Sequence, residues 1–162
     1  MYEITVQRAT AIKSLPSAAK LKLWAKAALQ AKMKAAELNI RIVDKKEIME
    51  LNSTYRHKHK PTNVLSFPFD MPKELDTQCP VLGDIVICAE IIAEEAREQG
   101  KTLDSHWAHM VVHGTLHLLG YDHEQDHDAE IMEAEEIKIL HALGLPNPYH
   151  PKFGSCNRSE KG

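Results

Sequence analysis

The sequence predicts a single domain that mixes four strands with five helices. Two patterns support this prediction: short segments alternate apolar and polar residues with the period of a strand, and longer segments repeat apolar residues with the period of a helix. The length of 162 residues suits one domain with one substantial core. No repeat or linker interrupts the chain before about residue 145, so we expect a domain over residues 1–145 and a flexible polar tail over residues 146–162.

The first three elements are a strand, a helix and a second strand. Residues 2–7 alternate like a short strand, and residues 38–43 (LNIRIV) alternate again and are rich in β-branched side chains. Between them, residues 17–36 are rich in Ala, Leu and Lys and place their apolar residues at helical spacing.

A second helix is expected to begin at Asp44. Asp44 and Glu47 resemble a capping box, in which two side chains satisfy backbone N–H groups of the first turn. This helix should run to about Tyr55, with Ile48 and Leu51 facing inward. The remaining elements are two strands, at residues 63–67 and 82–89, and three helices, at residues 89–99, 104–119 and 128–143.

The net charge of −3 hides an uneven distribution of charge. Residues 8–60 contain 13 Lys and Arg against 4 Asp and Glu, whereas residues 70–136 contain 3 against 17. A basic half attracts phosphate groups, which permits contact with RNA or the ribosome although the total charge is acidic. Two solvated surfaces without a partner explain the charges equally well.

Neither a membrane span nor a disulfide framework is expected. The apolar stretches are far shorter than the roughly 20 residues of a membrane span, and the N-terminus lacks a basic-then-apolar signal pattern. Cys79, Cys88 and Cys156 are odd in number and share no CxxC spacing. We therefore expect a soluble, cytoplasmic protein whose cysteines are buried or incidental thiols.

The most informative segment is HGTLHLLGYDH at residues 113–123. His113 and His117 are four residues apart, so on a helix both rings lie on one face and can reach one ion. Gly120 can adopt the left-handed conformation that ends a helix, which lets His123 approach the same ion. Three imidazoles suit one zinc ion and leave a coordination position for water or substrate, as in catalytic sites. We therefore predict His113, His117 and His123 as metal ligands.

The same segment argues against a protease. Metzincin proteases have the pattern HExxHxxGxxH, in which the Glu after the first His is the general base. Gly114 stands at that position here, so the usual route of peptide hydrolysis lacks its base. Of the neighbouring histidines, we expect His109 to pack or to support the ligands, and His127 to lie at the solvated start of the last helix.

Arg56 is the candidate catalytic residue outside the histidine segment. It ends the second helix, just before a loop, and its guanidinium could hold phosphate oxygens with two parallel hydrogen bonds. Composition alone favours a plainer interpretation, in which Arg56 and nearby lysines form a solvated helix end that complements the helix dipole.

The chain resembles the YbeY family of bacterial rRNA maturation factors, which are single-strand-specific, metal-dependent endoribonucleases. The resemblance rests on HGTLHLLGYDH, on LNSTYRHKHKPTNVLSFPF at residues 51–69 and on LGDIVI at residues 82–87, and it extends to about residue 145. It implies an α+β, zincin-like fold with a mixed four-stranded sheet flanked by about five helices. It also implies one Zn²⁺ ion held by His113, His117 and His123, and a functional role for Arg56.

The function that the resemblance implies is RNA cleavage in 16S rRNA 3′-end maturation and late ribosome quality control, with single-stranded rRNA and ribosomal proteins as partners. Attack by metal-activated water and attack by the ribose 2′-hydroxyl are alternative routes. Asn63 departs from the family pattern, which usually has Asp after Thr62, and the departure removes a charge. The rival functions are a non-enzymatic ribosome assembly factor whose zinc serves folding and, ranked lower, a metalloprotease with a different base.

Overall fold

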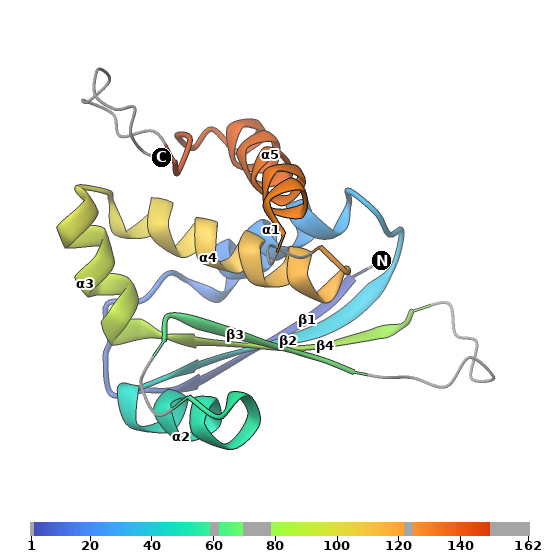
Figure 1. Cartoon of the computed structure of the whole chain (residues 1–162). Coiled ribbons are helices and arrows are strands. Elements are labelled where there is room, and N and C mark those ends of the chain that lie inside the picture. Colours follow the sequence, from blue (N-terminus) through green and yellow to red (C-terminus); the bar gives the residue numbers. More distant parts are fainter. Residues whose placement is uncertain (1, 59–61, 70–78, 122–124, 150–162) are drawn as a thin grey trace.

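The computed structural model describes residues 2–58, 62–69, 79–121 and 125–149. Over these residues the chain forms a sheet and a set of helices (Figure 1). The strands are β1 (Tyr2–Ala9), β2 (Ala36–Val43), β3 (Val64–Pro68) and β4 (Val81–Cys88). The helices are α1 (Ala18–Leu29), α2 (Lys45–Arg56), α3 (Ala89–Gln99), α4 (Leu103–Leu118) and α5 (Asp126–Ala142).

The four strands form one mixed sheet in the order β1-β2-β4-β3. β1, β2 and β4 run parallel, and β3 pairs antiparallel with β4 at one edge. The register places Ile40 opposite Val6 on one side and opposite Ile85 on the other, and Ser66 opposite Ile85. This architecture confirms the expected α+β fold, with a mixed four-stranded sheet and five helices in the described chain.

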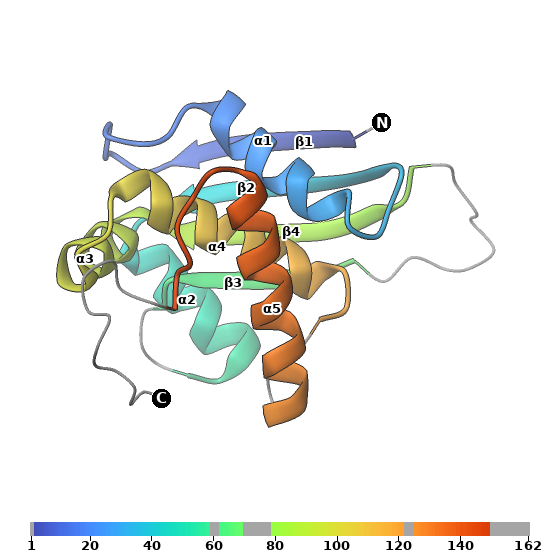
Figure 2. The same cartoon turned by 90° about the horizontal axis from the view of Figure 1, so that it is seen from above.

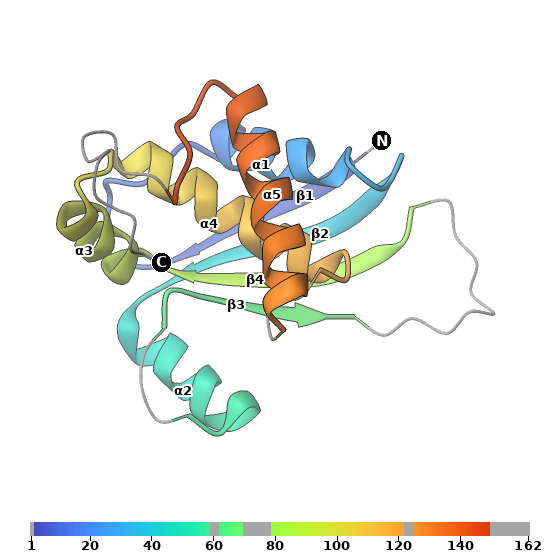
Figure 3. The same cartoon turned by 45° about the horizontal axis from the view of Figure 1, so that its top comes forward.

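Helices cover both faces of the sheet. α2 packs on one face, whereas α1 and α4 lie on the other (Figures 1 and 3). α5 crosses the outer side of α4, and α3 lies against the N-terminal end of α4 (Figure 2). α4 is therefore enclosed by α1, α3, α5 and strands β3 and β4, which explains why polar side chains on it need internal partners.

Alternating side chains of the central strands supply two cores. Leu38, Ile40 and Ile42 of β2, with Ile85 and Ile87 of β4, face α1 and α4 and are fully buried. The alternation follows from the strand period of two residues. A smaller core on the α2 side contains Val43, Ile48, Leu65, Val86 and Cys88.

α1 is shorter than the sequence predicts. The helix expected over residues 17–36 ends at Leu29, and Ala36 already belongs to β2. Ala36 pairs with Tyr2 of β1, and the Tyr2 hydroxyl donates to the carbonyl oxygen of Met33 at 2.5 Å. Pairing within the sheet thus overrides the helix propensity of an Ala- and Lys-rich segment.

α2 begins where expected, but not through the expected capping box. Asp44 is the N-cap residue, yet its side chain makes no capping hydrogen bond and instead accepts one from the Thr10 hydroxyl. Glu47 binds Arg41 through two contacts, at 2.7 and 3.0 Å. Both acidic side chains bind partners outside the helix, Thr10 and Arg41, so the prediction of a capping box is wrong.

The other predicted elements begin and end within two residues of the observed ones, and α3 matches its prediction. Ile48 is buried and Leu51 is half-buried, as expected for the inward face of α2. Burial also raises the pKa of the Cys88 thiol at the end of β4. None of the helices in the described part of the chain is long and apolar enough to cross a membrane.

Candidate metal centre

α4 carries four histidines at helical spacing. The ring centroids of His106 and His109 are 6.1 Å apart, those of His109 and His113 are 6.1 Å apart, and those of His113 and His117 are 4.7 Å apart. His106 and His109 are buried, whereas His113 and His117 are half-buried. The structure therefore brings His113 and His117 together on one accessible side of the helix. His127 is exposed in the first turn of α5, as expected.

A glycine turn ends α4. Gly120 has a φ of +106°, which side chains rarely tolerate. Its N–H donates to the His117 carbonyl at 3.0 Å, and the N–H of Tyr121 donates to the Leu116 carbonyl at 3.0 Å. These two bonds form a Schellman motif, so the predicted helix stop is present. His123, the third predicted ligand, lies outside the described residues.

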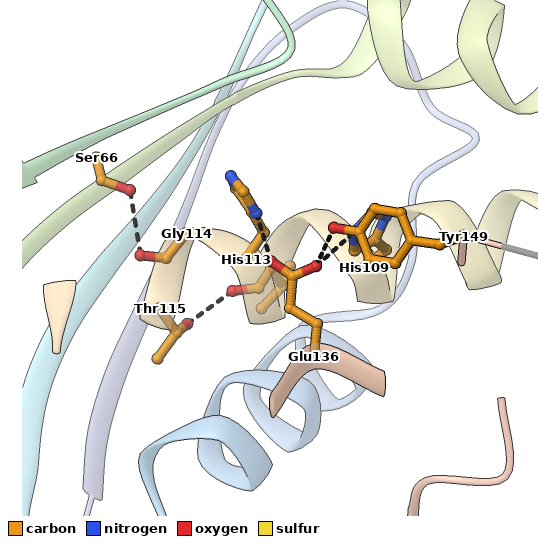
Figure 4. A network of polar contacts seen from close by, with 8 residues as sticks. Ser66, His109, His113, Gly114, Thr115, Glu136 and Tyr149 are labelled. Atoms are coloured by element: carbon orange, nitrogen blue, oxygen red, sulfur yellow. Dashed lines mark hydrogen bonds and ion pairs between the residues drawn. The ribbon is translucent and has the colours of Figure 1, made fainter. Parts of the chain in front are cut away.

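Gly114 lies where α4 presses against the sheet. A Cβ atom at residue 114 would stand 2.8 Å from Cγ2 of Ile85 and 3.4 Å from Oγ of Ser66. The Ser66 hydroxyl donates to the Gly114 carbonyl oxygen at 3.1 Å (Figure 4). The position that holds the base in HExxH proteases therefore faces the sheet here, and a Glu would have to push the helix away from it.

Glu136 of α5 joins two of the histidines. Its Oε1 atom lies 2.9 Å from Nε2 of His109, and its Oε2 atom lies 2.6 Å from Nδ1 of His113. The hydroxyl of Tyr149 also donates to Oε1, so three polar groups converge on one carboxylate (Figure 4). The exposed fraction of Glu136 is 0%. A carboxylate this far from water requires such partners.

These contacts set the charge of the cluster. Burial opposes ionisation of Glu136, but hydrogen bonds from His109 and His113 outweigh it and lower the pKa of Glu136 from 4.5 to about 2. Burial lowers the pKa of His109, which favours its neutral ring. Burial and the nearby Glu136 carboxylate both raise the pKa of the Tyr149 hydroxyl. An ionised carboxylate can only accept a hydrogen bond, so Nδ1 of His113 carries the proton in its contact with Glu136.

His109, His113 and Glu136 form a group that could hold a metal ion, since one ligand atom from each lies within 4.8 Å of the others. Ligand atoms of a tetrahedral zinc site are separated by about 3.3 Å, given Zn–N and Zn–O distances near 2.0 Å. The 2.6 Å contact between His113 and Glu136 is shorter and has the length of a hydrogen bond. A zinc ion shared by these three residues would require that pair to separate.

Arg56 is exposed and ends α2. Its Nη2 atom donates to the carbonyl oxygen of Ser66 at 2.9 Å. The side chain of the same Ser66 contacts Gly114, so two hydrogen bonds connect the guanidinium to the turn of α4 between His113 and His117. One of the five N–H donors of Arg56 makes the Ser66 contact, which leaves the guanidinium able to bind a further acceptor.

Asn63 contacts Glu95 of α3. Its Nδ2 atom donates to the two carboxylate oxygens at 3.2 and 3.4 Å. Glu95 also lies 2.8 Å from Nε2 of His106, which is buried and whose pKa is lowered by burial. The amide therefore serves as a donor to an acidic residue, whereas an Asp at this position would face a second carboxylate.

Sequence reasoning overlooked Glu136 and Tyr149. A signal for Glu136 was present, because it interrupts an apolar stripe at helical spacing. The buried residues of α5 are Met132, Glu136, Ile139 and Leu140. Tyr149 lies within the predicted tail at 146–162, among polar and proline residues that give no sign of an internal contact.

A cavity of about 1010 Å³ borders the buried part of the cluster. His106, His109 and Tyr149 contribute to its walls, together with residues 144–148. The Nδ1 atoms of His106 and His109 are buried and have no hydrogen-bond partner among the described residues. A cavity of this size has room for water, but the two nitrogens themselves have almost no surface open to it.

The fold and the cluster define a class of protein, an α+β domain in which a histidine-bearing helix packs across a mixed sheet and presents a group that could hold a metal ion. The chain belongs to the YbeY endoribonuclease family, whose profile matches residues 4–144. The solution structure of TM1509 from Thermotoga maritima is similar, with a TM-score of 0.55 and 27% sequence identity, covering 89% of this chain and 92% of that one. Family membership supports an RNA-hydrolysing enzyme with a role in rRNA processing.

Proposed function

We propose that this protein is a zinc-dependent endoribonuclease that cuts single-stranded RNA in 16S rRNA 3′-end maturation and in late ribosome quality control. The observation that carries the proposal is the pairing of His113 and His117 on one side of α4, 4.7 Å between ring centroids, in a member of an endoribonuclease family. Ribosomes and ribosomal proteins are the proposed partners, and the cytoplasm is the proposed compartment.

His113, His117 and His123 are the proposed zinc ligands. The donor set fits the ion, because imidazole nitrogens are preferred zinc ligands and the first two rings lie one helical turn apart. The Schellman motif at Gly120 ends α4 three residues before His123 in the sequence. When bound, zinc would supply Lewis acidity toward a phosphate oxygen and acidify water near neutral pH.

Arg56 is the proposed catalytic residue. Its guanidinium would bind a non-bridging phosphate oxygen and stabilise the negative charge that grows there in the transition state. The contact with Ser66 fixes the side chain relative to α4, which reduces the entropy lost when phosphate binds. Attack by metal-activated water and attack by the ribose 2′-hydroxyl can be distinguished with RNA that has a 2′-deoxyribose at the scissile nucleotide. Continued cleavage of this RNA would exclude attack by the 2′-hydroxyl.

The basic N-terminal half is the proposed contact surface for RNA phosphates. Lys22 and Lys26 of α1 and Lys58 after α2 are exposed, whereas Lys20 pairs with Asp104 at 2.6 Å. Phosphate contacts carry little sequence information, so the choice of one rRNA end would come from the ribosomal context.

The test is cleavage of a single-stranded rRNA fragment by the zinc-loaded protein, beside His117→Ala with its folding checked by circular dichroism. Cleavage by the parent and none by a folded variant would support the proposal. A zinc-bound parent that cleaves neither the fragment nor rRNA in ribosomal particles would favour the assembly factor. Unfolding of His113→Ala would point the same way, because a zinc ion used only for folding is lost together with the fold.

A further inference from the structure

We propose that Glu136 is a positioning residue for the metal centre: its carboxylate holds the Nδ1–H tautomer and the ring orientation of His113, so that Nε2 is directed at the ion. This inference rests on the proposed function, which makes His113 a ligand. The contact that motivates it is the 2.6 Å approach of Glu136 Oε2 to His113 Nδ1.

The burial of Glu136 is hard to explain by packing alone. It is a fully buried acid on a helix face that is otherwise apolar, and a hydrophobic residue of similar volume often stabilises such a position as well or better. A metal-binding histidine commonly donates its other ring N–H to a carboxylate, which fixes the tautomer and raises the basicity of the ligating nitrogen. The geometry at His113 matches that arrangement.

The two oxygens of Glu136 have separate partners. Oε1 accepts hydrogen bonds from His109 and Tyr149, and Oε2 accepts one from His113 (Figure 4). Donors on both oxygens prevent the carboxylate from rotating, so the orientation of His113 depends on α5 and on residue 149. In this inference His109 acts on the centre indirectly, by holding the Glu136 carboxylate.

The same helix provides a matched comparison. His106 lies 2.8 Å from Glu95, so α4 has a second histidine–carboxylate pair of similar length. His106 is not a predicted ligand, and its pair lies nearer the N-terminus of α4. Glu95→Gln therefore changes the same kind of contact on the same helix without touching the proposed centre.

The main experiment measures the zinc dissociation constant of the full chain by competition with a chromophoric chelator. Glu136→Gln keeps the shape of the side chain but removes its charge, and it should weaken zinc binding about 10–100-fold. Glu95→Gln should bind zinc as tightly as the parent. Circular dichroism confirms that both variants are folded. Equal affinity in the parent and Glu136→Gln, or equal losses in both variants, would overturn the inference.

A second measurement uses the parent protein alone, so it tests the inference even if Glu136→Gln does not fold. Long-range ¹H–¹⁵N correlation spectra of the zinc-loaded parent report which nitrogen of His113 carries the proton. A protonated Nδ1 and a metal-shifted Nε2 are expected, and the reverse assignment would overturn the inference.

Two further results distinguish this inference from a role of Glu136 as a metal ligand and from the proposed endoribonuclease function. If His117→Ala keeps full zinc affinity while Glu136→Gln loses binding altogether, Glu136 is itself a ligand and the positioning role is refuted. If the variants behave as expected but the parent does not cleave RNA, the proposed endoribonuclease function falls while the role of Glu136 in the metal centre stands.

Discussion

The carboxylate of Glu136 lies 2.6 Å from Nδ1 of His113, although 23 residues separate the two in the chain. This contact attaches α5 to the middle of α4 and gives a buried acid its compensating donor. The stability of the helix pair and the chemistry of the histidine are therefore linked through one carboxylate.

Acidification should destabilise the protein through this cluster. The pKa of Glu136 falls from 4.5 to about 2 on folding, so between these values the unfolded chain binds more protons. The contribution is complete above pH 4.5 and is lost as pH falls toward 2, and it amounts to roughly 3 kcal/mol. Burial also lowers the pKa values of His106 and His109, so their contribution begins to be lost below about pH 6.5. Urea unfolding measured between pH 7 and pH 3 should show both losses.

Glu136→Gln provides the control for this pH dependence. The variant should lack the loss of stability below pH 4.5 and retain the loss that begins near pH 6.5. A variant whose unfolding free energy follows the parent at every pH would show that Glu136 does not ionise as described.

Gly114→Ala should destabilise the protein by about 1–3 kcal/mol, although Ala is the better helix former by about 1 kcal/mol. The new methyl group would stand 2.8 Å from Cγ2 of Ile85, a buried branched side chain that cannot move aside easily. Ile85→Ala removes that atom, so adding Gly114→Ala to Ile85→Ala should cost much less than adding it to the parent. Equal costs in both backgrounds, measured by urea unfolding, would refute the close packing described at this position.

Asn63→Asp should lower the unfolding free energy by about 1–3 kcal/mol at pH 7, because it replaces a donor to Glu95 with a like charge. Adding Glu95→Gln should restore most of the stability, since an amide can donate to the new carboxylate. A stable single variant would mean that the Asn63 contact contributes little.

Arg56→Ala should lower the rate of RNA cleavage about 100-fold or more while changing the unfolding free energy by less than about 1 kcal/mol. The small effect on stability follows from the exposure of the side chain, whose hydrogen bond to Ser66 lies near the surface. Arg56→Lys keeps the positive charge but cannot make two parallel hydrogen bonds to a phosphate. Its cleavage rate should therefore lie between those of Arg56→Ala and the parent. Lys138→Ala changes an exposed lysine of α5 outside the proposed contact surface and is the control for a general loss of positive charge. Equal rates in Lys138→Ala and Arg56→Ala would remove the special role of Arg56.

Local sequence patterns, each spanning a few residues, predicted several elements of the fold and part of the candidate site. The spacing of His113 and His117 places both rings on one side of any helix, and Gly120 stops that helix because its backbone tolerates a positive φ. Alternation over residues 38–43 predicted the strand β2, since the strand period is fixed by backbone geometry, and Leu38, Ile40 and Ile42 of that strand enter the core. The resemblance to an endoribonuclease family also rested on local motifs, and the family match over residues 4–144 confirms it.

Contacts between distant segments were decided only by the tertiary structure. α1 ends early because Ala36 pairs with Tyr2. The Asp44 side chain accepts a hydrogen bond from Thr10 instead of making the expected capping bond. The environments of Gly114 and Glu136 also arise from distant segments. Gly114 has no room for a side chain because the sheet lies beside it, and Glu136 binds a histidine on another helix. Local sequence sets backbone conformation, but the partner of a buried polar group depends on which elements meet when the chain packs.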